Sequence, residues 1–247
     1  MWELCIHCMR VLAGLLVCSI GGVDAAAEQS LQGSVAVPSD YIVRGLSHSD
    51  DQAELQFDIH AVNSAGIFGG LFASTAQFEA HQARKVEFDP YLGYGWQLGN
   101  DWRAKVLTDA YVYPRNTEGP GYHYEEIAFA VTYRDWMSMQ VSYSPDTPRV
   151  SRYAGLLTVP AASAEVSLIR PLFGRLLATS GIGYCHLDGR PEAFTALDYI
   201  YWSIGADYEL APVSLTASYV GTSEAAKALY YNGSGGDRWV GAIIWRF

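Results

Sequence analysis

Hydrophobic and polar residues alternate with a period of two over many stretches of this chain. In residues 199–210 the even positions are Ile, Trp, Ile, Ala, Tyr and Leu, whereas the odd positions are Tyr, Tyr, Ser, Gly, Asp and Glu. Residues 137–144 and 54–61 show the same alternation. Because successive side chains of a strand point to opposite faces, the pattern predicts half-buried β-strands.

This periodicity predicts an all-β fold of about twelve strands, with ten or fourteen as alternatives. Many of the predicted strands reach the length of about ten residues that a tilted membrane-spanning strand needs. After the first residues, no apolar run is long enough for a membrane-spanning helix. The predicted strands cover residues 31–46, 53–63, 66–78, 86–98, 101–114, 122–134, 136–145, 159–170, 174–187, 197–210, 212–222 and 238–247.

The connections between the predicted strands are alternately long and short. The turns NSAG at 63–66 and GND at 99–101 are short, whereas residues 145–158 and 222–237 form long connections. Antiparallel outer-membrane β-barrels have long loops outside the cell and short turns in the periplasm. The alternation therefore predicts a transmembrane β-barrel, and an even strand number predicts that both termini are periplasmic.

The N-terminal residues have a different pattern. Arg10 precedes the apolar run of residues 11–23, and Ala25 and Ala27 follow in an A-x-A arrangement. This is the layout of a secretory signal peptide. We therefore expect residues 1–27 to be a cleaved signal peptide and residues 28–247 to be a single outer-membrane barrel domain.

The cysteine content argues against a disulfide-stabilised protein, and the net charge argues against a nucleic-acid-binding protein. The expected cleavage leaves Cys185 as the only cysteine, which cannot form an internal disulfide bond. The net charge of −10 argues against nucleic-acid binding, which needs a basic face. The 17 tyrosines and 7 tryptophans agree with a protein made of strands.

In a membrane barrel, polar side chains face the lumen and apolar side chains face lipid. The phase of each predicted strand assigns its residues to one of these two faces. The predicted lumen residues are Asp40, Arg44, Asp58, Arg103, Lys105, Asp109, Glu126, Arg134, Glu165, Asp207, Glu209, Arg238 and Arg246. The predicted outward aromatic residues at the lipid interface are Trp96, Trp102, Tyr133, Tyr143, Trp202, Tyr208, Tyr219, Trp239, Trp245 and Phe247.

Asp40 and Arg44 share one face of the first predicted strand, opposite Tyr41 and Val43. If the first strand pairs with the last, Arg238 or Arg246 approaches Asp40, and Asp58 or Glu54 approaches Arg44. Such ion pairs either fill and rigidify the lumen or form a constriction that selects solutes. Both readings are open from the sequence.

The chain ends in RWVGAIIWRF. A terminal Phe247 with Trp245 two residues before it is similar to the C-terminal signal of outer-membrane proteins, which implies recognition by the barrel-assembly machinery. The alternative is an ordinary strand that happens to end in phenylalanine.

The stretch SDYIVRGLSHS at residues 39–49 resembles the SDY-x-x-RG-x-S-x-S signature of the TorF-type porin family. The segment GGLFAS at 69–74 and the aromatic C-terminus also resemble that family. His48 and Val43 stand where the family commonly has Gln and an aromatic residue. The resemblance implies a porin role and assigns no functional residue. The matching positions are Ser39, Asp40, Tyr41, Arg44, Gly45, Ser47 and Ser49.

Enzymatic and metal-binding functions have little support in the sequence. His60, His81, His123 and His186 are the candidate bases for a lipid hydrolase, but no G-x-S-x-G motif accompanies them. The acidic stretch HSDDQ at 48–52 lacks EF-hand spacing. We therefore predict no enzymatic activity, no metal and no cofactor.

The function that we expect is passive diffusion of small solutes through a narrow charged lumen, with a weak cation preference from a slight acidic excess. The expected partners are outer-membrane lipid, the barrel-assembly machinery and small solutes, with no nucleic acid. The alternatives are a non-conducting structural or adhesion barrel, a lipid-modifying enzyme, and a soluble periplasmic β-sandwich.

Overall fold

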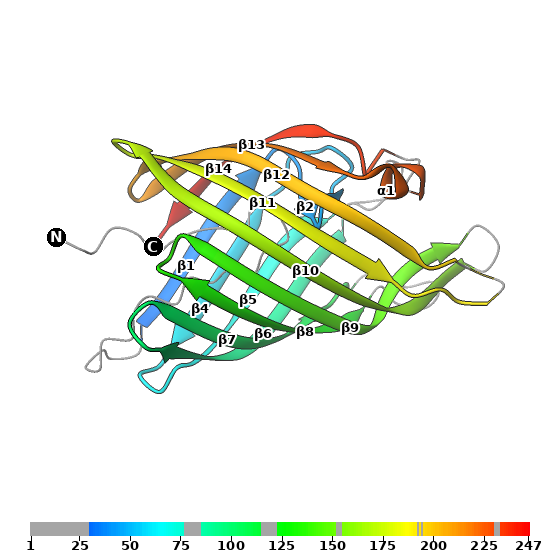
Figure 1. Cartoon of the computed structure of the whole chain (residues 1–247), viewed down its shortest axis with the longest axis horizontal. Coiled ribbons are helices and arrows are strands. Elements are labelled where there is room, and N and C mark those ends of the chain that lie inside the picture. The colour runs from blue at the N-terminus through cyan, green and yellow to red at the C-terminus, as the bar shows by residue number, and fades with distance from the viewer. Residues whose placement is uncertain are drawn as a thin grey trace.

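The structure is a computed structural model and describes residues 30–76, 85–114, 123–151, 155–191, 193, 195–229 and 233–247. In these residues, twelve antiparallel strands form one closed barrel (Figure 1). The barrel strands are β1 (Ser30–Pro38), β4 (Gln56–Val62), β5 (Ile67–Ala76), β6 (Lys85–Leu98), β7 (Trp102–Tyr111), β8 (Tyr124–Tyr133), β9 (Met137–Ser151), β10 (Gly155–Phe173), β11 (Leu176–Leu187), β12 (Leu197–Leu210), β13 (Val213–Thr222) and β14 (Arg238–Arg246).

Two short strands and a short helix lie outside this ladder. Strands β2 (Ile42–Val43) and β3 (Leu46–Ser47) pair with each other, and α1 (Glu224–Leu229) precedes β14. Within the described ranges, no helix combines the length and hydrophobicity that crossing a membrane requires.

The barrel closes because β1 pairs with both β4 and β14. Val35 lies opposite Phe57 on β4 and opposite Trp245 on β14. Phe247 extends this pairing, since its amide donates to the Gly33 carbonyl at 3.0 Å and its carbonyl accepts a bond from the Gly33 amide at 2.9 Å. Closure leaves the barrel without an edge strand.

The two ends of the barrel differ in the length of their connections (Figure 1). At the end where β1 begins and β14 ends, the strands are joined by short turns, such as those at 63–66 and 99–101. We call this the turn end and the opposite end the loop end. The twelve strands and the alternation of connections agree with the sequence prediction.

The sequence prediction of a long loop at residues 145–158 is wrong. Strand β9 continues to Ser151 and β10 begins at Gly155, so both project beyond their neighbours at the loop end (Figure 1). The two strands stay paired here, with Leu157 opposite Arg149, beyond a register shift between Val159 and Ala161. The paired stretch contains Pro145 and Pro148, and a strand accepts proline where the missing N–H leaves no ladder bond unpaired.

The barrel has an apolar outside and a polar inside. Large exposed hydrophobic residues lie on the outer face of nearly every strand, whereas the inward positions hold charged and polar side chains that are buried. The exposed set includes Leu92, Ile127, Val141, Ile182, Ile204 and Ile243. The buried polar set includes Asp58, Glu87, Asp109, Glu126, Gln140 and Asp207. This distribution is the reverse of a soluble protein and is typical of membrane barrels.

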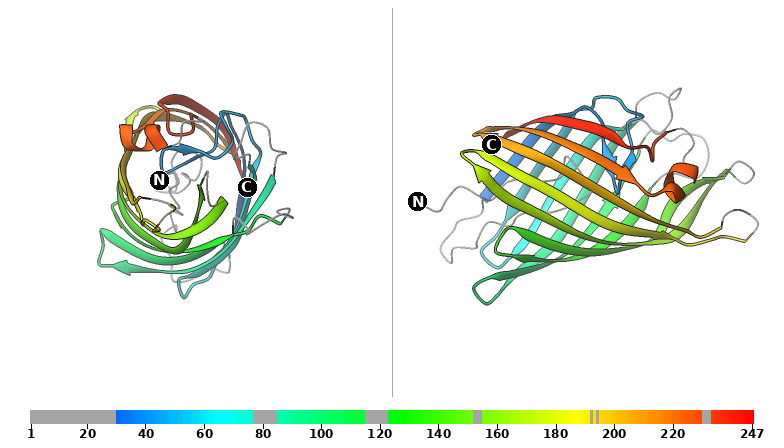
Figure 2. Two further views of the ribbon diagram at one scale, coloured as in Figure 1. Left: turned by 90° about the vertical axis from the view of Figure 1, so that its right-hand side faces the viewer. Right: turned by 45° about the horizontal axis from the view of Figure 1, so that its top comes forward.

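The first predicted strand is shorter than expected. β1 ends at Pro38, and the chain then turns into the barrel (Figure 2, left). It returns to the wall at residues 54 and 55, where the Glu54 amide donates to the Pro38 carbonyl and the Leu55 carbonyl accepts a bond from Thr75 on β5. We call residues 39–55 the inward segment. Tyr41, which the strand phase placed outside, is buried within the barrel.

Candidate functional site

The inward segment reverses direction at its tip, between β2 and β3. Arg44 and Gly45 adopt positive φ angles of 50° and 79°, the left-handed conformation that glycine accepts without strain. A Cβ atom on Gly45 would lie only 2.6 Å from Thr222 Cγ2 and 2.7 Å from Tyr201 Cβ. The tip is therefore packed against the inner wall formed by β12 and β13.

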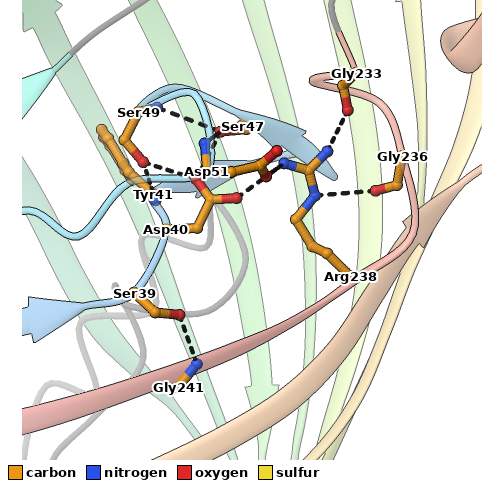
Figure 3. Close-up of polar contacts among 10 residues, drawn as sticks. All are labelled: Ser39, Asp40, Tyr41, Ser47, Ser49, Asp51, Gly233, Gly236, Arg238 and Gly241. Atoms are coloured by element: carbon orange, nitrogen blue, oxygen red, sulfur yellow. Dashed lines mark hydrogen bonds and ion pairs between the residues drawn. The ribbon is translucent and has the colours of Figure 1, made fainter. Parts of the chain in front are cut away.

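Asp40 organises the base of the inward segment (Figure 3). Its Oδ1 accepts hydrogen bonds from Ser47 Oγ at 2.6 Å and from Ser49 Oγ at 2.7 Å. Ser49 Oγ in turn accepts a bond from the Tyr41 amide at 2.8 Å. Asp40 is buried, so these bonds replace the water that its carboxylate loses.

Arg238 fastens this base to the loop end of β14 (Figure 3). Its Nη1 donates to Asp40 Oδ2 at 3.0 Å and also pairs with the Asp51 carboxylate. Its Nε donates to the Gly236 carbonyl at 3.0 Å, and its Nη2 donates to the Gly233 carbonyl. One guanidinium group therefore joins two parts of the inward segment to the loop before β14.

Backbone hydrogen bonds add to this attachment. The Ser47 amide donates to the Ser234 carbonyl at 2.9 Å. The Ser39 amide donates to the Gly241 carbonyl at 2.8 Å. The Gly241 amide donates in turn to the side-chain Oγ of Ser39 at 3.0 Å (Figure 3). The inward segment is therefore held along its length by β14 and its preceding loop.

The Arg44 side chain connects the tip of the inward segment to the barrel wall at β8 and β9. Its Nη2 pairs with the Glu126 carboxylate on β8 and donates to Ser142 Oγ on β9 at 2.9 Å. These strands lie far around the barrel from β14 in the strand order. The segment thus links opposite sides of the interior.

Tyr41 brings the segment against a third part of the wall. Its hydroxyl donates to Glu87 Oε1 on β6 at 3.4 Å, and its ring centroid lies 6.1 Å from that of Phe72 on β5. Since the segment contacts β5, β6, β8, β9, β12, β13 and β14, it narrows the lumen from several sides.

The structure places most of the predicted lumen residues on the inside. Asp58, Lys105, Asp109, Glu126, Glu165 and Asp207 are buried at inward positions, and Arg103, Glu209, Arg238 and Arg246 are half-buried there. Asp40 and Arg44 lie inside as well, but on the inward segment and not on a barrel strand. Arg103 pairs with Asp135, and Arg246 donates to Ser214 Oγ at 2.7 Å.

The placement of Arg134 in the lumen is wrong. β8 ends at Tyr133, and Arg134 and Asp135 adopt positive φ angles of 46° and 61° in the turn that follows. The Arg134 side chain is 58% exposed and pairs with Asp101 in the neighbouring turn at 2.8 Å. This hydrogen bond and the charge of Asp101 raise the pKa of Arg134 above its usual value.

The predicted outward aromatic residues all lie on the outer phase of their strands, and they gather in groups. Near the turn end, the ring centroid of Tyr133 lies 4.7 Å from that of Trp102 and 5.6 Å from that of Trp136. Toward the loop end, Tyr219 lies 5.4 Å from Trp202 and 5.2 Å from Trp239. The outward set also includes Trp96, Tyr143, Tyr208, Trp245 and Phe247.

The sequence prediction missed several inward residues. Glu87 and Asp89 on β6 are buried, as are tyrosines on β6, β7 and β8. The alternation within residues 86–98 carries the signal that could have found the two acids. The tyrosines in question are Tyr91 on β6, Tyr111 on β7, Tyr113 just beyond β7, and Tyr124 on β8, and Tyr199 and Tyr201 are likewise buried on the inward face of β12.

The candidate histidines make ordinary polar contacts. His60 Nδ1 lies 2.7 Å from Asp58 Oδ1, and His186 lies between Asp188 and Asp198 at 2.8 and 2.7 Å. His123 Nδ1 accepts a bond from the Tyr113 amide at 3.0 Å. His81 lies outside the described residues. Within the described part of the chain, no group of three or more His, Cys, Asp or Glu side chains could hold a metal ion.

Comparison with known proteins gives one family match. Residues 23–245 match a family described as "Bacterial protein of unknown function (Gcw_chp)". The resemblance to the TorF-type porins is not tested by this match and stays a prediction. No curated protein matches the sequence.

Several solved structures share the fold. The NanC porin is similar with a TM-score of 0.56 and 8% identity, over 87% of this chain and 98% of that chain. The KdgM porin is similar with a TM-score of 0.52 and 9% identity, over 87% of this chain and 99% of that chain. At such identities the similarity concerns the barrel fold alone.

Proposed function

We propose that this chain, which belongs to the Gcw_chp family of bacterial proteins, is an outer-membrane porin through which small solutes diffuse. The observation that carries the proposal is the charged interior of a closed barrel, crossed by an inward segment that β14 holds in place. A lumen lined by charged groups is built to hold water and polar solutes, and a segment across it sets the width of the passage. The proposed role needs no catalytic group.

The outer surface supports a place in the membrane. Closure satisfies the backbone hydrogen bonds of every strand, which lipid cannot do. The outward aromatic residues at both ends, including Trp102 and Trp239, suit the two interfaces of a bilayer. We infer that the turn end faces the periplasm of a Gram-negative bacterium, that residues 1–27 are a signal peptide, and that Trp245 and Phe247 are read by the barrel-assembly machinery.

The charges of the lumen favour a weak preference for cations. Among the described residues, acidic side chains outnumber basic ones at buried positions, although half-buried arginines offset part of the difference. The buried acids are Asp40, Glu54, Asp58, Glu87, Asp89, Asp109, Glu126, Glu165 and Asp207, against Lys105 and Arg149. Counter-ions of these carboxylates would be enriched in the passage.

Single-channel recording tests this proposal. Residues 28–247 are refolded in detergent, checked for heat-modifiable gel migration, and added to a planar bilayer under a potassium chloride gradient. We expect discrete current steps and a reversal potential of the sign that favours potassium. Folded barrels that insert without current steps would refute the porin, and equal permeability of the two ions would remove the cation preference.

A non-conducting barrel is the second candidate, and one observation favours it. The inward segment and the buried tyrosines, including Tyr41 and Tyr111, take up part of the lumen. A folded but silent barrel in the same recording is the result that this candidate predicts.

A further inference from the structure

A buried polar cluster lies on the inner wall at the loop end, around Ser74 on β5. Ser74 is directly opposite Gln56 on β4 and Glu87 on β6, and its hydroxyl donates to the Glu54 carboxylate. Glu54, Gln56 and Glu87 are only 4%, 3% and 1% exposed. Two carboxyl groups and one amide therefore lie around Ser74 on neighbouring parts of the inner wall, at positions that bulk water does not reach.

Several polar atoms of this cluster have no hydrogen-bond partner. Within the described part of the chain, these are Glu54 Oε1, Glu87 Oε2, and both Oε1 and Nε2 of Gln56. A buried polar atom without a partner is costly, and such atoms in a native structure call for an explanation. Three of the four are acceptor oxygens, so the missing partner is a group that donates hydrogen bonds.

A primary ammonium group matches this set. It carries three N–H donors and no acceptor, and its positive charge offsets the two neighbouring carboxylates. A metal ion fits less well, because the described residues contain no group of three or more metal-binding side chains. The remaining unpartnered atom, Gln56 Nε2, is a donor and would donate a hydrogen bond to an oxygen atom of the same solute.

Aromatic rings complete the cluster on the side of the lumen. Tyr41 of the inward segment reaches Glu87 with its hydroxyl, and its ring lies beside that of Phe72. Aromatic faces attract cations and exclude water, which strengthens the interaction of the carboxylates with an ammonium group. The inward segment thus contributes Tyr41 to the cluster and also narrows the lumen.

We infer that Glu54, Gln56 and Glu87 form a binding subsite for the primary ammonium group of small amine solutes that enter from the loop end. The inference names the solute class of the proposed pore and rests on that proposal for its role. Binding itself is measured on the folded barrel and does not need conduction.

Isothermal titration calorimetry with methylammonium chloride tests the subsite on the refolded barrel. We expect the wild type to bind, and Glu54→Gln and Glu87→Gln each to weaken binding by about tenfold, the loss expected for one charge-assisted hydrogen bond. Glu165→Gln is the matched control, because Glu165 is a buried inward glutamate of β10 with one unpartnered oxygen. The affinity of the Glu165→Gln barrel for methylammonium should equal that of the wild type.

Tetramethylammonium supplies a control that needs no variant, since it has the same charge without N–H donors. We expect it to bind the wild type much more weakly than methylammonium. A folded wild type that does not bind methylammonium, or that binds both cations equally, overturns the subsite. Unchanged binding by both glutamine variants does so as well.

The outcomes for the subsite and for the pore are separable. A barrel that conducts potassium chloride but does not bind methylammonium keeps the porin and loses the subsite. A silent barrel that binds methylammonium with the expected variant effects keeps the subsite and loses the porin.

Discussion

At the scale of single residues, Arg238 is the most connected side chain that holds the inward segment. It pairs with Asp40 and Asp51 and donates to two carbonyl groups of the loop before β14. The Asp40 carboxylate is buried and depends on this guanidinium for its counter-charge. The position of the inward segment therefore depends strongly on one ion pair.

Arg238→Ala tests that dependence. Removing one partner of a buried ion pair costs about 3–5 kcal/mol, so we expect the inward segment to leave its place for part of the time. Single-channel currents should become larger and noisier than those of the wild type. Arg134→Ala is the control, because it removes an exposed arginine of a turn and should leave the currents unchanged. A wild-type current pattern in Arg238→Ala would contradict this role.

Of the two ion pairs that Asp40 and Arg44 form, the sequence predicted the one of Asp40. The expectation that Arg238 or Arg246 approaches Asp40 agrees with the observed contact of Arg238. The prediction that Asp58 or Glu54 approaches Arg44 is wrong, because Arg44 pairs with Glu126. Because the chain reverses at Arg44 and Gly45, the Arg44 side chain lies away from the neighbouring strand. A pattern of alternating polarity does not predict such a turn.

At the scale of elements, alternation predicted where most strands lie, because lipid and lumen impose opposite polarity on adjacent residues. The prediction of 197–210 coincides with β12, and several others differ by one or two residues. The first strand was extended too far because residues 39–46 alternate like a strand. Their polarity instead reflects contacts with several parts of the inner wall, which lie far away in sequence.

Ile204→Arg tests the outward face of a strand. Ile204 lies at the middle of β12 and is 61% exposed. A charged side chain on the lipid face near the bilayer centre costs about 2–4 kcal/mol, so the free energy of unfolding from lipid vesicles should fall by that amount. Ile204→Ala keeps the position apolar and should lose less. Equal stability of Ile204→Arg and the wild type would contradict the assignment of this face to lipid.

At the scale of the whole molecule, the polarity of the barrel and the asymmetry of its ends make the case for a pore. Both could be predicted from the sequence, since they follow from repeated local patterns. The filling of the lumen could not, because it depends on which distant side chains a segment meets after it enters the barrel. Glu126, Glu87 and Arg238 are such contacts, and each is far from residues 39–55 in sequence.

The most direct test of a pore narrowed by the inward segment compares single-channel conductance with and without that segment. The Glu54 amide donates to the Pro38 carbonyl at 3.1 Å, so the ends of β1 and β4 are adjacent and a two-residue Asn-Gly turn can replace residues 40–52. Both proteins are checked for heat-modifiable migration and recorded in the same bilayer. The account predicts discrete steps for the wild type and several-fold larger steps for the shortened barrel. Steps of equal size, or a shortened barrel that folds and stays silent, would contradict it.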